Sequence, residues 1–169
     1  MEKVTAAEQQ TTLIAGTTGR ATHPSPRHRE IPFCPPPGLP ANIPPPLKPI
    51  SPGVDEKTGG LIIQIPFNNI EFLEQAFTHF GNELAAAFIE PIYYNAGCIL
   101  PTQKFMRVLR DETRRRGIVL IFDEVQSAFR MGPGGAQELL GVVPDLCTVG
   151  KAVGGGYPLS VFGGRTDIM

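Results

Sequence analysis

Residues 117–124 read GIVLIFDE, and this stretch decides the fold: five apolar residues, Ile118 to Phe122, run without alternation into Asp123 and Glu124. A continuous apolar run of this length is typical of a strand buried on both faces, as in a parallel sheet. The sequence therefore predicts a central strand that carries a carboxylate at its carboxyl end.

Segments on both sides of this strand alternate between strand and helix patterns. Upstream, a strand is expected at 61–66, and then a helix in which Asn68 and Glu71 form a capping pair. A strand follows at 85–89 and ends at Glu90. A second helix spans 102–116 and stops at Gly117. Downstream, we expect a short helix at 135–140 and strands at 146–149 and 159–162. This alternation predicts an α/β fold, with an incomplete, mostly parallel sheet and flanking helices.

The N-terminal part differs in composition. Most of the chain's 18 prolines fall between Pro24 and Pro52. Proline fixes φ and removes a backbone donor, so this stretch suits neither a helix interior nor a central strand. We therefore expect residues 1–58 to form a Pro-rich, disordered leader, and residues 59–169 to form part of one domain.

Charge and composition exclude several classes of function. The formal net charge is −1, which gives no general attraction to nucleic acid or to anionic lipid. No stretch approaches the roughly eighteen apolar residues that a membrane helix requires. The three cysteines form no CxxC pair and have no nearby histidine, so no metal site is expected. A reducing, cytoplasmic location fits this cysteine usage.

Two ionisable residues follow strands of the expected sheet, Asp123 and Lys151, and several kinds of site could use them. A P-loop needs G-x-x-x-x-G-K-[ST], but position 145 is Asp and position 152 is Ala. A dinucleotide site needs G-x-G-x-x-G, which neither glycine cluster completes. A pyridoxal-phosphate enzyme needs a lysine that carries the cofactor as a Schiff base and an acid that keeps the pyridine nitrogen protonated. Lys151 and Asp123 are residues of the two types that such an enzyme requires.

Three segments resemble the class III aminotransferases, a family of fold-type I pyridoxal-phosphate enzymes. Residues 121–130, IFDEVQSAFR, are similar to the family's D-E-V-x-[ST]-x-F-R segment. Residues 144–158, PDLCTVGKAVGGGYP, are similar to its lysine segment, and residues 86–91, AAFIEP, to the strand that precedes both. The resemblance covers the chain from about Leu61 to its end, so the chain resembles a central fragment of the family's large domain.

The resemblance implies roles for particular residues. Lys151 would be the catalytic lysine and would bind pyridoxal 5'-phosphate. Asp123 would pair with the pyridinium nitrogen, Val125 would lie on one face of the ring, and Gln126 stands where some members bond the ring's phenolic oxygen. Glu90 lies at a strand end near the site, with no role assigned.

The resemblance also bears on activity and partners. It implies a small-molecule amino substrate and a homodimer for the full-length family. The Phe129-Arg130 pair and residues 163–165 are most like the aminomutases of the family, whereas Gln126 stands where those enzymes more often have Met. No glycine-rich phosphate loop precedes residue 61. The alternative hypothesis is therefore a non-catalytic remnant, able at most to associate with an intact homologue.

Overall fold

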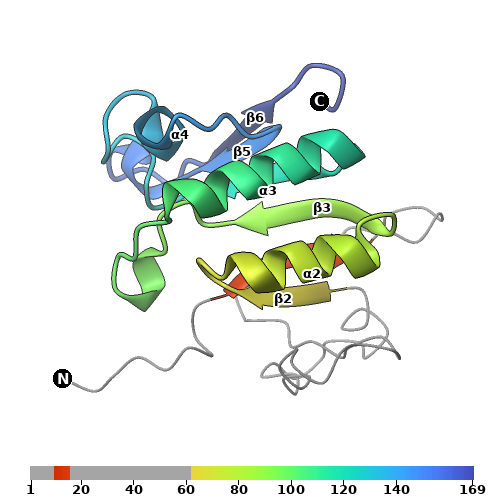
Figure 1. Cartoon of the computed structure of the whole chain (residues 1–169). Helices are drawn as coiled ribbons and strands as arrows, with labels where there is room; N and C mark the ends of the chain where they lie inside the picture. The colour runs from red at the N-terminus through yellow and green to blue at the C-terminus, as the bar shows by residue number, and fades with distance from the viewer. Residues whose placement is uncertain (1–9, 16–61) are drawn as a thin grey trace, which may run out of the picture.

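The computed structural model describes residues 10–15 and 62–169, which form a six-stranded sheet with helices against it (Figure 1). The strands lie side by side in the order β2-β1-β3-β4-β5-β6. Their bounds are β1 Gln10–Ala15, β2 Ile62–Pro66, β3 Leu84–Ile89, β4 Val119–Asp123, β5 Leu146–Val149 and β6 Val161–Gly164. The predicted α/β fold is confirmed.

Strand direction confirms the mostly parallel sheet. The central strands β3, β4 and β5 pair in parallel. β1 is antiparallel to both of its neighbours, so β2 runs in the same direction as β3. β6 is antiparallel to β5. Four of the six strands, β2 to β5, therefore share one direction, and the carboxyl ends of the central three meet at one edge of the sheet.

Strand β1 corrects the expectation of a disordered leader over residues 1–58. Three of its six residues, Thr11, Thr12 and Ile14, are β-branched, which favours a strand. The strand lies between β2 and β3 and pairs with both, so its backbone groups have partners on two sides. The rest of that prediction, including the prolines from Pro24 to Pro52 and the boundary at residue 58, lies outside the described residues.

Helix α2 (Ile70–Phe80) begins one residue later than the sequence predicted. Asn69 is the N-cap and accepts a hydrogen bond from the Phe72 N–H at 3.0 Å. Asn68 adopts a left-handed φ of 65°. Its side-chain amide donates to the Leu100 carbonyl and accepts from the Thr102 N–H. The first of two adjacent asparagines thus joins distant loops, and the second caps the helix.

Helix α3 (Gln103–Arg116) ends where the sequence predicted and begins one residue later than predicted. Thr102 accepts a hydrogen bond from the Phe105 N–H, and Gly117 ends the helix with a left-handed φ of 71°. Helix α4 (Gly135–Leu140) has its predicted bounds, and the short 3-10 helices are η2 (Tyr94–Ala96) and η3 (Lys151–Gly154).

Strand β6 starts two residues later than predicted. Its register places Gly164 beside Leu146, where a Cβ at position 164 would collide with the Asp145 carbonyl oxygen. The strand therefore lies where a glycine allows close backbone approach.

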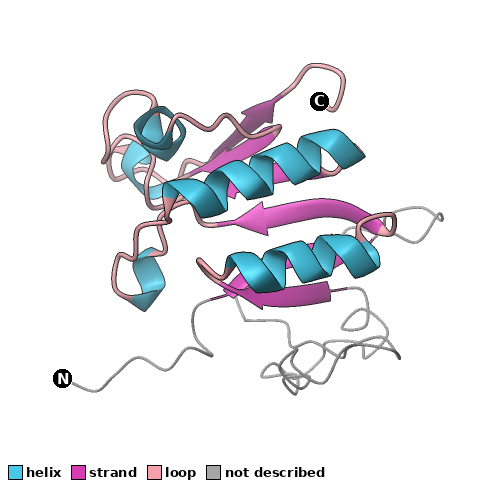
Figure 2. Cartoon of the chain, in the orientation of Figure 1, coloured by secondary structure: helices cyan, strands magenta, loops and turns pink. Residues whose placement is uncertain are grey.

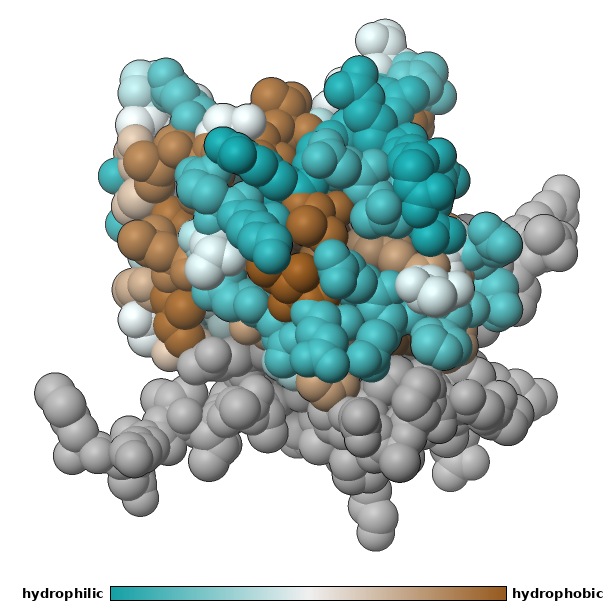
Figure 3. All heavy atoms as spheres, in the orientation of Figure 1, coloured by the Kyte–Doolittle hydropathy of each residue, from teal (hydrophilic) through white to brown (hydrophobic). Residues whose placement is uncertain are grey.

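Helices α2 and α3 lie across the same face of the sheet (Figure 2). Apolar residues of both helices and of β2, β3 and β4 form the core between these two layers, including Leu73, Phe77, Phe105, Leu109 and Phe122, each at most 1% exposed. The outer surface of the helix layer is mainly hydrophilic, and hydrophobic residues gather along the left edge of the view, on the side toward which β3 points (Figure 3). The core thus supports the central strands from one side and leaves their carboxyl ends at an edge.

Candidate active site

The candidate site lies where β3, β4 and β5 end. Glu90 follows β3, Asp123 is the last residue of β4, and Lys151 comes two residues after β5. The pairing of β4 with β5 places Asp123 opposite Thr148, three positions before Lys151. Parallel strands bring their carboxyl ends to one edge of a sheet, where ligands of open α/β folds bind. The structure therefore brings together the acid and the lysine that the sequence singled out.

Asp123 is half-buried and partly engaged by its surroundings. Its Oδ1 accepts a hydrogen bond from the Val125 N–H at 3.0 Å and a longer one from the Thr148 hydroxyl at 3.4 Å. No described residue forms a hydrogen bond to Oδ2. The hydrogen bonds to Oδ1 thus fix the carboxylate, and Oδ2 can accept a hydrogen bond from a ligand.

Lys151 is exposed and has a left-handed φ of 46°. Such a conformation costs roughly 1–3 kcal/mol in a non-glycine residue, and strained residues of this kind cluster at functional sites. Asn68, Cys98 and Phe129 also have a left-handed φ. The preceding Gly150 is buried against Val125: a Cβ at position 150 would lie 3.2 Å from Val125 Cγ1. Val125, from the segment after β4, is therefore packed against the backbone that leads into Lys151.

Three polar side chains form a chain of hydrogen bonds along the same edge. Gln126 Nε2 donates to Asn95 Oδ1 at 2.9 Å, and Asn95 Nδ2 donates to Glu90 Oε1 at 3.0 Å. Sequence reasoning named Gln126 and Glu90 but missed Asn95, which lies in η2, 31 residues before Gln126. The proximity of Asn95 to a strand-end glutamate was the one local signal that could have found it.

The surroundings of Glu90 raise the pKa of its carboxyl group. Burial raises the pKa of Glu90 above its ordinary value of 4.5, and the hydrogen bond from Asn95 lowers it. The negative charge of Asp123 raises that pKa further, and the positive charge of Lys151 lowers it. Glu90 therefore lies within electrostatic range of both residues, at the same edge of the sheet.

Glu124 follows Asp123 directly in the sequence, but its side chain is buried and has a structural role. Its side chain is 1% exposed and accepts hydrogen bonds from the N–H groups of Ala136 and Gln137 at the start of α4, and from the Ser127 hydroxyl. A Cβ at Gly135 would lie 2.5 Å from Glu124 Oε2. This carboxylate thus occupies the N-terminus of α4 and ties that helix to the end of β4.

Asp145 supports the site from the amino end of β5. It is 2% exposed, binds Arg110 of α3 through two hydrogen bonds of 2.8 and 3.0 Å, and accepts from Arg165 at 3.1 Å. Its Oδ2 also accepts from the Leu120 N–H of β4. Burial raises its pKa, but Arg110, the Leu120 N–H and Arg165 together outweigh burial and lower the pKa to about 2. Asp145 is therefore an ionised link between α3, β4 and β5.

Other candidate chemistry finds little support in residues 10–15 and 62–169. Burial, with the negative charges of Glu124 and Asp123, raises the pKa of the Cys147 thiol to about 11, so the thiol stays protonated. No group of three or more metal-ligating side chains lies together in this part of the chain. None of its helices has the length and apolar character needed to cross a membrane.

Comparison with known proteins adds a family to this geometry. The family model described as aminotransferase class-III matches residues 46–169. A glutamate-1-semialdehyde 2,1-aminomutase of Sulfurihydrogenibium azorense is 46% identical over 121 residues, which cover 72% of this chain and 28% of that protein. The chain thus spans just over a quarter of the length of the curated relatives it matches.

Solved structures agree with the sequence comparison. An omega-transaminase from Sphaerobacter thermophilus superposes with a TM-score of 0.69 and 39% identity, over 73% of this chain and 28% of that one. A structure described as a transaminase with pyridoxal phosphate bound gives a TM-score of 0.64 and 31% identity, over 68% of this chain and 27% of that one. The similarity therefore extends from the three segments to the backbone that carries them.

Proposed function

The chain belongs to the class III aminotransferase family, and we propose that its described part forms the reacting side of a pyridoxal-phosphate site, with Lys151 as the reactive lysine. The observation that carries this proposal is the position of Asp123 and Lys151 at the ends of adjacent parallel strands. The influence of both charges on Glu90 supports it.

Each residue at the strand ends would have a separate task. Pyridoxal phosphate, when bound, supplies an aldehyde that condenses with an amine and a ring that withdraws electrons from the substrate's α-carbon. Asp123 would hold the proton on the pyridine nitrogen through Oδ2, which forms no hydrogen bond with another described residue. Lys151 Nζ would hold the cofactor by condensing with its aldehyde, with loss of water, and once displaced by the substrate's amine it would take the proton from the α-carbon and return it.

The residues present fit a flat, positively charged ring. Asp123 Oδ2 has no hydrogen-bond partner among the described residues, and Val125 offers an apolar surface beside the backbone of Gly150 and Lys151. Gln126 lies one residue further on and would face the phenolic oxygen.

A phosphate group finds no open helix N-terminus among the described α-helices. Asn69 and Thr102 cap α2 and α3, and the Glu124 carboxylate occupies the start of α4. The described residues therefore account for the ring and the reacting amine, and not for the phosphate.

Cofactor labelling tests the proposal. The purified chain is mixed with pyridoxal phosphate at low concentration, reduced with borohydride, and digested for mass mapping. We expect the label at Lys151, its loss in Lys151→Ala, and reduced labelling in Asp123→Asn. Lys104→Ala, which removes an exposed lysine on α3, is the matched control and should leave Lys151 labelling unchanged. Label scattered over several lysines would support the alternative, a non-catalytic remnant able at most to associate with an intact homologue.

We further propose that the protein acts as an aminotransferase or aminomutase, most like glutamate-1-semialdehyde 2,1-aminomutase. The aminomutase name of the curated relative at 46% identity supports that choice. Both reactions use a lysine to move a proton on an amino substrate, and they differ in whether the amino group stays on the same molecule. To distinguish them, the purified protein, once its Lys151 has been shown to take the label, is mixed with pyridoxal phosphate and then with either a 4,5-diamino acid or a simple ω-amine. A change in the bound cofactor's spectrum with the former alone would favour the aminomutase.

A further inference from the structure

The chain Gln126–Asn95–Glu90 has a defined direction. An ionised carboxylate can only accept hydrogen bonds, so Asn95 must turn its Nδ2 toward Glu90. Asn95 Oδ1 is then left to accept, and Gln126 donates to it through Nε2. The charge at Glu90 therefore fixes the orientation of two side-chain amides in series, the second of which belongs to the candidate cofactor site.

The second oxygen of Glu90 differs from the first. Oε2 is buried from solvent and has no hydrogen-bond partner among the described residues. A buried acceptor without a partner costs roughly 1–3 kcal/mol, and such groups in native structures call for an explanation. Oε2 is thus the position where a proton can bind without displacing Asn95 from Oε1.

Charged and polar groups from three other elements face Glu90. Asn95 and the backbone of Tyr94 face it from η2, the Asp123 carboxylate from β4, and Lys151 from η3. Burial has the largest effect on Glu90, and it favours the protonated form, as does the charge of Asp123. The pKa of Glu90 is therefore raised, although the hydrogen bonds from Asn95 and the Tyr94 backbone and the charge of Lys151 act in the opposite direction.

We propose that Glu90 is a positioning residue: its carboxylate, acting through Asn95, holds the amide of Gln126 in one orientation, and proton binding at Oε2 loosens that hold. A hydrogen bond to a charged acceptor is roughly twice as strong as one between neutral groups. Protonation thus weakens the Asn95 bond and gives both amides more freedom. We call the hydrogen-bonded series Gln126–Asn95–Glu90 the relay. The consequence of the relay for cofactor binding rests on the proposed function, but the relay itself does not.

NMR of the cofactor-free chain tests the relay directly. The side-chain amide signals of Asn95 and Gln126 and the carboxyl carbon of Glu90 are followed from pH 7 downward. We expect all three to change together, with one midpoint above 4.5, the ordinary glutamate value. Asp145, with a pKa of about 2, stays ionised across this range and maintains the fold.

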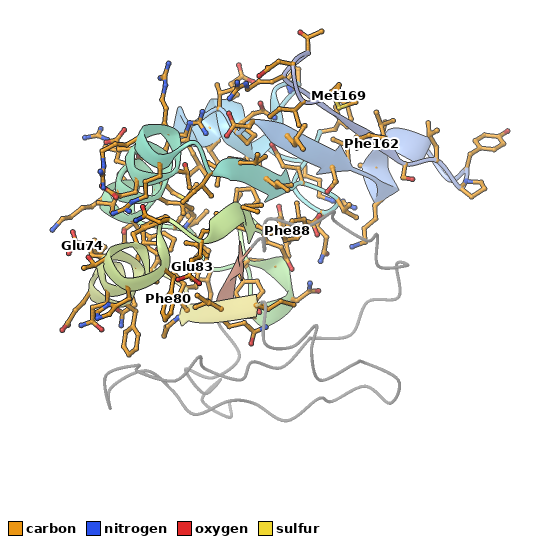
Figure 4. The ribbon with its side chains drawn as sticks, turned by 90° about the vertical axis from the view of Figure 1, so that its right-hand side faces the viewer. Glu74, Phe80, Glu83, Phe88, Phe162 and Met169 are labelled. Atoms are coloured by element: carbon orange, nitrogen blue, oxygen red, sulfur yellow. The ribbon has the colours of Figure 1, made fainter. Side chains whose placement is uncertain are left out.

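Three variants separate positioning from a general structural role. Glu90→Gln should abolish the shared pH response of both amides. Asn95→Ala should shift the midpoint of the Glu90 titration upward, because the bond that lowers this pKa is lost, and should remove the response of Gln126. Glu83→Gln is the matched control, because Glu83 is exposed and lies at the opposite, amino end of β3, which faces the viewer in Figure 4. It should leave all three titrations unchanged.

Two results would overturn the proposal: a Gln126 amide that does not follow the Glu90 titration, or one that keeps its pH response in Glu90→Gln. Lys151 labelling measured on the same samples reports on the proposed function separately. A relay without Lys151 labelling would refute the cofactor site and leave the relay standing. Lys151 labelling without a relay would refute the relay and leave the cofactor site standing.

Discussion

Replacing Asp145 by Asn should destabilise the chain by an amount that depends on pH. The substitution keeps the shape of the side chain and removes the charge that Arg110 and Arg165 share. One pKa unit corresponds to about 1.4 kcal/mol, so the difference between 3.8 and about 2 is worth roughly 2 kcal/mol of folding free energy at pH 7.

The sign of the pH dependence follows from the direction of the pKa change. The folded state binds the Asp145 proton less readily than the unfolded state does, so this stabilisation is complete above the unfolded pKa of 3.8. It decreases as the pH falls from 3.8 toward 2 and is lost below about 2. The difference between the wild type and Asp145→Asn should therefore be largest near neutral pH and should vanish in strong acid.

Urea unfolding followed by far-UV circular dichroism measures both quantities. All variants are measured in the same concentration of sucrose, which strengthens burial and keeps the folded baseline accessible. Asp167→Asn is the control, since Asp167 also binds Arg165 but is exposed, and its loss should have little effect. Equal urea midpoints for Asp145→Asn and the wild type at pH 7 would refute the reasoning. A difference that persists unchanged at pH 2 would assign the effect to packing instead of charge.

Three further substitutions test the site and its supports. Gly150→Ala should reduce Lys151 labelling severalfold with the fold retained, because the new Cβ would press on Val125; mass mapping and circular dichroism on one sample measure both. Glu124→Gln should lower the unfolding free energy by about 1–3 kcal/mol, since glutamine keeps only one acceptor oxygen for the N–H groups of Ala136 and Gln137; urea unfolding measures it. Lys151→Gly should leave stability unchanged or raise it, because glycine adopts a left-handed φ without strain, and the same unfolding assay checks this.

Local sequence patterns predicted the groups at the strand ends. An apolar run that ends in Asp123, and a shorter one that leads to Gly150 and Lys151, each locate a strand and its carboxyl end without knowledge of the partners. Parallel pairing then brings the two ends together. The acid and the lysine could therefore be found from sequence, because one rule about sheets converts their positions along the chain into proximity.

Contacts between distant segments could not be predicted in this way. The bond from Gln126 to Asn95 and the bonds from Asn68 to residues 100 and 102 each span more than thirty positions. Their partners are set by how loops lie at the sheet edge, which no local period encodes. Strand β1 escaped prediction for a related reason, since a short β-branched stretch becomes a strand only when two neighbours complete its hydrogen bonds.

The segments that resemble the family contain residues that stabilise the fold as well as the residue proposed to react. Glu124 stands beside Asp123 in one segment, and Asp145 shares the other with Lys151; both carboxylates are buried and hold the fold. A chain that needed only to fold would have reason to keep these two acids whether or not it bound a cofactor. Lys151 is different, because it is exposed, its side chain forms no hydrogen bond or ion pair with another described residue, and it adopts a conformation that glycine would take without strain. The proposed reaction with a cofactor would give a reason for a lysine at this position that folding does not, so the stability of Lys151→Gly tests that proposal alongside the labelling.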